Sequence, residues 1–101
     1  LVAVAVAEAG RVGVDIELHA PERPIMRIAE HLAAPVADAA AGYRVFTFWE
    51  AHFKAFGAWP EKGLLRAVAA SAAPMQEHGG VRLLHQVVEQ DFAFTLVWDQ
   101  L

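Results

Sequence analysis

The sequence contains no cysteine, so disulfide bonds, thiol catalysis and cysteine-bound zinc are all excluded. The five histidines contain no i,i+4 pair and no H-E-x-x-H motif, so a zinc site built from histidine is not expected. Ser71 lies in no G-x-S-x-G elbow, so serine hydrolysis has no support. Any chemistry of this chain should therefore come from its carboxylates and its few basic side chains.

Basic residues are also scarce, since 8 Lys and Arg stand against 12 Asp and Glu and give a formal net charge of −4. No basic run occurs, and nucleic acid is therefore not an expected partner. The longest uncharged strand candidate, Leu1–Ala7, is far too short to cross a bilayer. No signal peptide is recognisable either, and we expect a cytoplasmic protein that does not enter a membrane.

The chain does have abundant apolar residues, which make up 56% of its 101 positions. This length and composition predict one globular domain spanning residues 1–101. A mean hydropathy of +0.32 is high for so small a chain, so we expect part of the apolar surface to contact a partner or a second copy. Because Leu1 stands inside an expected strand, we also expect the chain to be a half or a fragment of a longer protein.

The segment from Arg11 to His19 alternates between apolar and polar residues, the pattern of a half-buried strand. We expect the apolar set to face the core, which places Asp15 and Glu17 together on the opposite face, about 6.5 Å apart. Two carboxylates at that distance repel by roughly 2–3 kcal/mol at an effective dielectric near 20. That face is therefore either well solvated or covered by a positive group. Gly13 would let a ligand approach the backbone just before the acids.

The elements around this strand follow from local signals. Leu1–Ala7 is expected to be a buried strand that forms a hairpin with the Asp15 strand. Pro24 should open a helix, and Pro35 a short alanine-rich helix that Gly42 ends. Tyr43–Phe56 is the strongest helix of the chain, with Gly57 at its C-terminal cap.

The last third of the sequence predicts mainly strands. Leu64–Ala73 fits either a strand or a helix, and we favour an irregular strand. Residues 78–80 are expected to form a turn, followed by strands at Val81–Val88 and Phe92–Trp98. This order of elements predicts an α+β fold, with helices packed on one side of an antiparallel sheet.

Two segments of the chain carry motif-like patterns. One is a hairpin strand of form G-[IV]-D-[IV]-E, which reads Gly13-Val14-Asp15-Ile16-Glu17 here. The other is a helix of form W-x-x-K-E-A-x-x-K-A-x-G, to which residues 46–57 correspond with Glu50-Ala51, Lys54-Ala55 and Gly57. Together the two segments resemble the motifs of the 4′-phosphopantetheinyl transferase superfamily. A following Lys62-Gly63-Leu64 resembles the K-G-L loop of the family. The resemblance covers nearly the whole chain, as the C-terminal half of the larger, two-lobed type.

The resemblance implies a magnesium-dependent transfer of the phosphopantetheine arm of coenzyme A to a serine of an acyl or peptidyl carrier protein. It implies Asp15, Glu17 and Glu50 as metal ligands, and hard carboxylate oxygens suit Mg²⁺. Glu50 and Lys54 would be the catalytic residues, with Glu50 taking the proton of the carrier serine. Lys54 and Lys62 would contact the phosphates of coenzyme A.

The sequence also departs from the family pattern. The upstream half with its Asn-x-Ser-His-Ser segment is absent, and Trp49 stands where the family has lysine before the glutamate. An acidic residue that many members carry after F-F-S has no counterpart, since residues 32–37 read Leu-Ala-Ala-Pro-Val-Ala. We therefore expect a homo-oligomer or a missing N-terminal half to complete the site. The alternative is a non-catalytic interaction domain of the same fold within a larger synthase.

Overall fold

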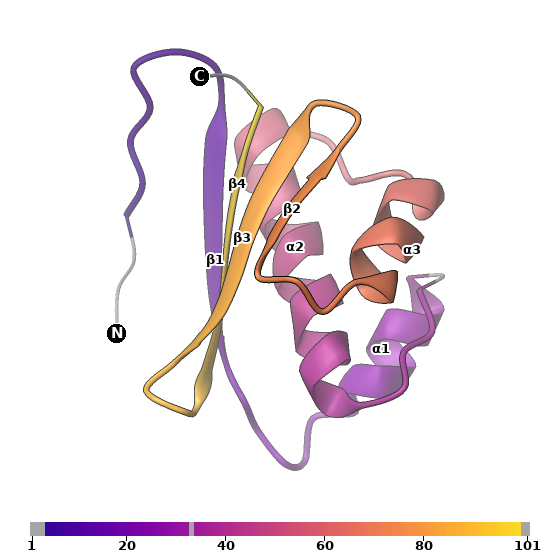
Figure 1. Cartoon of the computed structure of the whole chain (residues 1–101). Helices are drawn as coiled ribbons and strands as arrows, with labels where there is room; N and C mark the ends of the chain where they lie inside the picture. The colour runs from indigo at the N-terminus through magenta and orange to yellow at the C-terminus, as the bar shows by residue number, and fades with distance from the viewer. Residues whose placement is uncertain (1–3, 33, 100–101) are drawn as a thin grey trace.

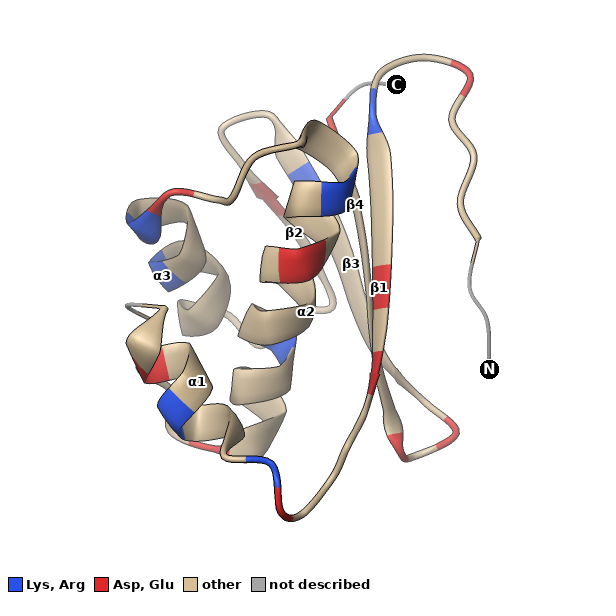
Figure 2. Cartoon of the chain, turned by 180° about the vertical axis from the view of Figure 1, so that it is seen from behind, with Lys and Arg blue, Asp and Glu red and all other residues tan. Residues whose placement is uncertain are grey.

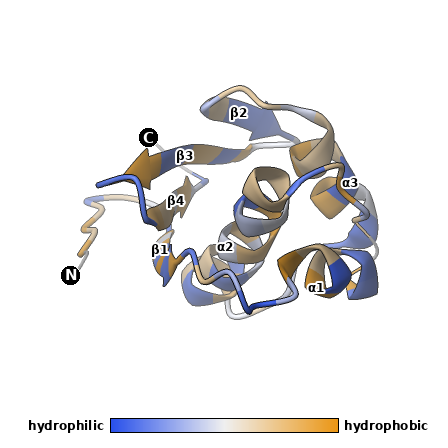
Figure 3. Ribbon diagram, turned by 90° about the horizontal axis from the view of Figure 1, so that it is seen from below, coloured by the Kyte–Doolittle hydropathy of each residue, from blue (hydrophilic) through white to orange (hydrophobic). Residues whose placement is uncertain are grey.

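The computed structural model describes residues 4–32 and 34–99, which form one α+β domain (Figure 1). A four-stranded antiparallel sheet has the order β1-β4-β3-β2, and three helices cover one of its faces (Figure 3). The predicted fold class is thus confirmed. Along the chain the elements are β1 (Val12–Leu18), α1 (Ile25–His31), α2 (Ala39–Phe56), α3 (Lys62–Ala70), β2 (Met75–His78), β3 (Val81–Val88) and β4 (Phe92–Trp98). In the described part of the chain, none of the helices has the length and apolar character that crossing a membrane requires.

Helix α2 is the central element, since it packs on β1 and β4 and on both other helices. It begins after Asp38, whose Oδ1 accepts a hydrogen bond from the backbone N–H of Ala41 at 2.8 Å. It ends at Gly57, which has φ +69° and donates its N–H to the carbonyl of Phe53. The helix and its glycine cap were predicted, but the separate helix ending at Gly42 is wrong. Because Asp38 is the N-cap of α2, the helix already begins at Ala39 and Gly42 lies inside it.

The hydrophobic core lies between α2 and the sheet. Its largest fully buried apolar side chains come from α2, α3, β3 and β4, and they are Val45, Phe48, Val68, Leu83 and Val97. Two threonines, Thr47 of α2 and Thr95 of β4, are buried among them. The core therefore joins the middle of α2 to the centre of the sheet.

Strand β1 faces the opposite way from the prediction. Gly13 and Asp15 are buried on the side of α2, whereas the alternating apolar residues of β1 lie on the side without helices. This helix-free side, called the outer face below, carries apolar residues on all four strands. In the register of the sheet its apolar residues are Val12, Val14, Ile16, Leu18, Met75, Leu84, Val88, Phe92, Phe94, Leu96 and Trp98.

The expected N-terminal strand is not formed in the described residues. Residues 1–3 of that prediction lie outside the described part, and residues 4–7 have no strand structure. The segment runs beside the sheet (Figure 1), and its valines are exposed, Val4 by 83% and Val6 by 90%. The predicted hairpin with β1 is thus wrong for these residues.

The segment after the loop is a helix and not the irregular strand that we favoured. Helix α3 buries Leu65 and Val68, three residues apart, and so follows the helical period. The guanidinium of Arg44, itself only 9% exposed, donates hydrogen bonds to the last-turn carbonyls of Val68 at 3.2 Å and Ala69 at 2.9 Å. Arg44 thus binds carbonyls that the end of a helix leaves free, and it ties α3 to α2.

The C-terminal strands match the prediction, with one addition. The turn at Gly79-Gly80 and the strands β3 and β4 are confirmed. The short strand β2 before the turn was not predicted, because its residues Met75–His78 show no clear apolar alternation. Between β3 and β4 the chain turns through Glu89 and Gln90, which both have positive φ.

Candidate functional site

The two segments that carry the family resemblance pack directly on each other. Gly13 of β1 lies against the backbone of α2, where a Cβ added to it would be 2.5 Å from Ala55 N and even closer to Ala51 O. Only glycine permits this approach, and the small side chains of Ala51 and Ala55 leave room for it. The glycine of the first motif and the alanines of the second therefore form one contact.

Asp15 and Lys54 are the predicted site residues that this contact brings together. Lys54 Nζ donates to Asp15 Oδ1 at 2.8 Å, and the lysine side chain is half exposed. Asp15 is only 4% exposed, and its Oδ2 is buried and finds no hydrogen-bond partner among the described residues. Burial raises the pKa of Asp15 above its usual value, the negative charges of Glu17 and Glu50 add to this, and the bond to Lys54 opposes it. The buried carboxylate thus has one oxygen free for a donor or a cation.

Glu17 lies two residues further along β1 and is paired with a residue that the motifs do not include. Arg23 Nη1 donates to Glu17 Oε1 at 3.0 Å, and both side chains are partly exposed. Lys54 and Arg23 therefore each place a positive group beside one acid of β1. A positive group over these acids was one of the two arrangements expected from their mutual repulsion. Arg23 was missed because it stands in the polar connection between β1 and α1.

Glu50 belongs to the same side of the molecule but bonds to neither acid. It is half-buried on α2 and makes no hydrogen bond or ion pair with the other described residues. Figure 2 shows acidic segments on β1 and α2 on the same side of the molecule, with a basic segment at the C-terminal end of α2. Within residues 4–32 and 34–99, no three carboxylates or histidines lie close enough together to hold one metal ion. The three predicted ligands are thus neighbours that do not form a single cluster.

Lys62 lies apart from this group. It is the first residue of α3 and is exposed, and no hydrogen bond or ion pair links it to another residue described here. Its predicted role in binding phosphate would require the ligand to extend from α2 to the start of α3. That role stays a prediction.

Trp49, which replaces the lysine of the family motif, is part of an aromatic stack on α2. The ring of Trp59 stacks on Trp49 at 3.8 Å and on Phe53 at 4.1 Å between ring centroids. At these distances the rings of Trp49 and Phe53 would overlap if both stacked on the same face of the Trp59 indole. Trp59 therefore lies between them. Trp49 therefore contributes apolar packing at the position of the missing positive charge.

A row of polar side chains crosses the sheet beneath α2. Asp15, Thr95 and His85 are direct partners in neighbouring strands. Thr47 Oγ1 lies 2.8 Å from the carbonyl oxygen of Tyr43, and a 2.6 Å hydrogen bond joins the hydroxyls of Thr47 and Thr95. Thr95 Oγ1 is also hydrogen-bonded to His85 Nδ1 at 2.7 Å. This chain of bonds links the imidazole of His85 to α2 through Thr95.

The stability of the protein should depend on pH through His85. Burial, aided by the positive charges of Arg44 and His19, lowers the pKa of His85 to about 4. The unfolded chain takes up this proton near pH 6.5 and the folded chain does not, so the free energy of unfolding falls as pH drops from 6.5 to 4. We expect His85 to account for up to about 3 kcal/mol of this loss. Urea unfolding at several pH values measures it.

The control for this prediction is His85→Gln, which cannot take up the proton. Protonation of Asp15 changes the stability in the opposite direction at low pH. The quantity to compare is therefore the difference in the free energy of unfolding between the wild type and His85→Gln. A difference that does not change between pH 4 and pH 7 would contradict a buried neutral imidazole. His31, which is exposed at the end of α1, provides a matched His31→Gln variant without the effect.

Comparison with known proteins leaves the function open. No protein-family model, no curated protein and no solved structure matches the chain. The resemblance to the phosphopantetheinyl transferases thus rests on the motif residues alone and stays a prediction. Any function must be argued from the contacts described above.

Proposed function

We propose that the chain is a phosphopantetheinyl transferase-like domain, which acts on coenzyme A and an acyl or peptidyl carrier protein. The observation that supports this most is the direct packing of the two motif segments, with Gly13 against Ala51 and Ala55 and Asp15 bonded to Lys54. Residues distant in the sequence thus meet at a buried carboxylate with a free oxygen. An ordinary amphipathic strand would not require an acid at that position.

The proposed ligands of Mg²⁺ are Asp15, Glu17 and Glu50, whose carboxylates would have to come closer together than they lie in the described residues. Their oxygens suit a hard cation, and both Asp15 Oδ2 and the Glu50 carboxylate have no hydrogen bond in the described structure. Glu17 fits only when it is released from Arg23. When bound, the ion would neutralise negative charge on the pyrophosphate and on the departing 3′,5′-ADP.

The remaining roles fall to side chains of this domain. In the transfer the serine oxygen of the carrier bonds to the phosphorus of phosphopantetheine, and the bond from that phosphorus to 3′,5′-ADP breaks. Glu50, on the exposed side of α2, would accept the serine proton. Lys54 keeps two N–H donors beyond its bond to Asp15 and would bind phosphate, together with Lys62.

The site needs further positive charge from outside these residues. Coenzyme A carries several phosphate charges, whereas Lys54 is already paired with Asp15 and Trp49 contributes none. We therefore propose that a second copy or an N-terminal half supplies the missing basic groups. The domain alone should transfer phosphopantetheine very poorly.

Magnesium alone tests the metal site without any need for activity. Because Mg²⁺ would bind the folded state and not the unfolded chain, it should raise the melting temperature at millimolar concentration. Asp15→Asn should abolish this shift, and Glu50→Gln should reduce it. An equal shift in Asp15→Asn would exclude Asp15 as a ligand.

The transfer itself is tested by labelling of a carrier protein with a fluorescent coenzyme A. We expect weak Mg²⁺-dependent labelling, which Glu50→Gln abolishes without a change in the melting temperature of the metal-free protein. Labelling that persists in Glu50→Gln and Asp15→Asn would contradict the proposed roles. Glu61→Gln, an exposed acid at the start of α3, is the control variant.

One alternative has its own support. The Asp15–Lys54 and Glu17–Arg23 pairs satisfy two of the three acids without any ligand, and Trp49 is committed to an aromatic stack. These contacts favour a non-catalytic interaction domain of the same fold. Absence of both the Mg²⁺ shift and the labelling, even with an N-terminal half supplied, would support this alternative.

A further inference from the structure

The outer face of the sheet is an apolar surface that the helices leave uncovered. All helices lie on the opposite side of the sheet (Figure 3), so the alternating apolar residues of β1 and β4 have no helix above them, and the segment of residues 4–9 stands over the end of the face at Val12, Leu96 and Trp98. Sheets of globular proteins bury such a face against another layer. An apolar face this wide on a folded chain indicates an interaction surface.

The charges of this face cancel each other. It carries Arg82 on β3 and Glu77 on β2, and Arg82 Nε donates to Glu77 Oε2 at 3.3 Å. The only other polar residue in the register of the face is the neutral Gln86. The whole chain has a net charge of −4, so two copies repel each other generally, but not through this face. A charged partner, by contrast, would find no unpaired group to bind.

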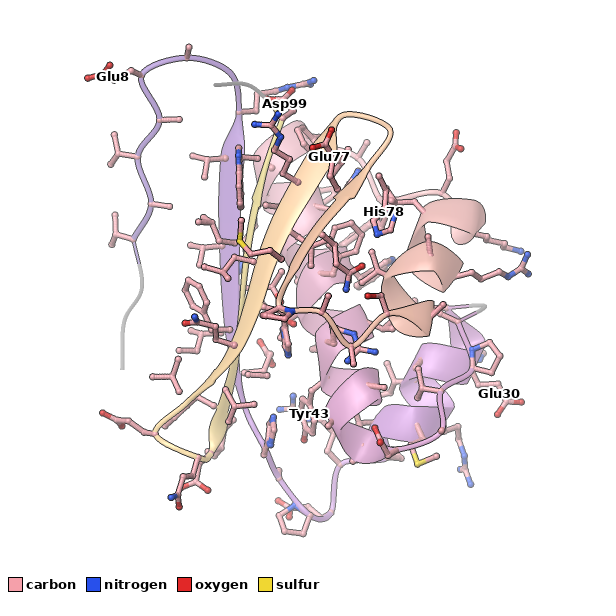
Figure 4. The ribbon with its side chains drawn as sticks, viewed as in Figure 1. Glu8, Glu30, Tyr43, Glu77, His78 and Asp99 are labelled. Carbon is pink, nitrogen blue, oxygen red and sulfur yellow. The ribbon has the colours of Figure 1, made fainter. Side chains whose placement is uncertain are left out.

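The segment of residues 4–9 extends the same surface. It stands away from the sheet and encloses with Val12, Leu96 and Trp98 a hollow of about 630 Å³. Figure 4 shows side chains on both sides of this segment, and Val4 and Val6 are almost fully exposed. The alternating valines thus offer a second apolar strip next to the outer face.

We propose that the outer face packs against the outer face of a second copy of this chain, as a two-fold sheet-on-sheet dimer. Two such faces are self-complementary, because each is apolar and neither carries an unpaired charge. Aligned sheets pack about 10 Å apart through interdigitating side chains. The four strands, of 7, 4, 8 and 7 residues, give a flat footprint of roughly 400 Å². Side-chain relief and the segment of residues 4–9 enlarge it toward the ~800 Å² per partner of stable interfaces.

This dimer is independent of the proposed function, because the outer face and the Asp15 site lie on opposite sides of the sheet. Sedimentation velocity of the whole chain over a wide concentration range tests it. We expect a dimer that Leu96→Lys, at the centre of the outer face, converts to a monomer by raising the dissociation constant roughly 100-fold or more. In the monomer the lysine would extend into the open hollow beside residues 4–9, so the circular dichroism of the variant should remain that of the folded chain.

Val87→Lys is the matched control, since Val87 is exposed on the helix-facing side of the same sheet. It should leave the dimer intact. Ile16→Lys is the second variant on β1, and it decides the result if Leu96→Lys fails to fold. A wild-type monomer at every concentration overturns the proposal, including a monomer that associates only with an added N-terminal half. A dimer that persists in the folded lysine variants overturns it too.

Discussion

Gly13→Ala should destabilise the protein more than the addition of one methyl group at any other position of β1. The new Cβ would be 2.5 Å from Ala55 N and closer still to Ala51 O, and both are backbone atoms of α2. Neither can rotate away as a side chain would, so the helix must lift from the sheet and loosen the core beneath Phe48. We expect a loss of about 3 kcal/mol or more in the free energy of unfolding, measured by urea denaturation.

Gly63→Ala is the matched control for this substitution. Gly63 lies in α3, its φ is not positive, and a Cβ there meets no atom within 4 Å. Alanine should therefore stabilise α3 by up to about 1 kcal/mol. If Gly13→Ala costs less than about 1 kcal/mol, the close contact between β1 and α2 does not exist as described.

Removal of either partner of the Asp15–Lys54 pair should have effects of opposite sign. Lys54→Met leaves a buried carboxylate without its donor, which should cost about 2 kcal/mol at neutral pH and less near pH 4. Asp15→Asn removes a charge whose pKa burial raises, so it should stabilise the metal-free protein. A raised carboxyl pKa means that the folded state disfavours the ionised form of Asp15. Removing this charge at neutral pH should therefore increase the free energy of unfolding.

Thermal unfolding of both variants and of the double variant at neutral pH measures these effects. The loss in Lys54→Met should largely disappear when Asp15→Asn is added, because no unpaired charge then remains. Suppose instead that Asp15→Asn destabilises the metal-free protein by more than about 1 kcal/mol. The carboxylate would then be structural, and its Oδ2 would be satisfied by a group such as a buried water.

The sequence predicted the class of the fold because α2 and the last two strands have strong local signals. It did not predict which side of β1 faces the core. Alternation shows that a strand has two faces, but here the apolar face is the outer one, and the face toward α2 holds Gly13 and Asp15. Small residues at Ala51 and Ala55, matched by a strand glycine, were the signal for close packing that the hydrophobic pattern concealed.

The errors at α3 and at the N-terminus have a common cause. Short apolar runs fit a strand or a helix equally well, and only the tertiary contacts of Leu65 and Val68 decide for a helix. Residues 4–7 have a strand-like sequence, but β1 does not pair with them in the described structure. Their apolar character fits an external contact as well as an internal one.

The candidate site was partly predictable. The two motifs brought Glu50 and Lys54 together with Asp15 as site residues, but only the three-dimensional structure shows that Lys54 bonds to Asp15. Arg23 could not be foreseen, because its contact with Glu17 depends on the path of the connection between β1 and α1. The stack of Trp59 between Trp49 and Phe53 likewise arises from the course of a loop.

The bond between Thr47 and Thr95 has a consequence for the orientation of α2. Apolar packing alone would tolerate small rotations of a helix about its axis, because one methyl group replaces another at little cost. A rotation of α2 would break the buried hydroxyl bond and leave Thr95 without its partner on the helix. The rotation of α2 about its own axis is therefore fixed inside the core by Thr47 and Thr95. In this way the two threonines also hold Glu50 and Lys54 beside β1.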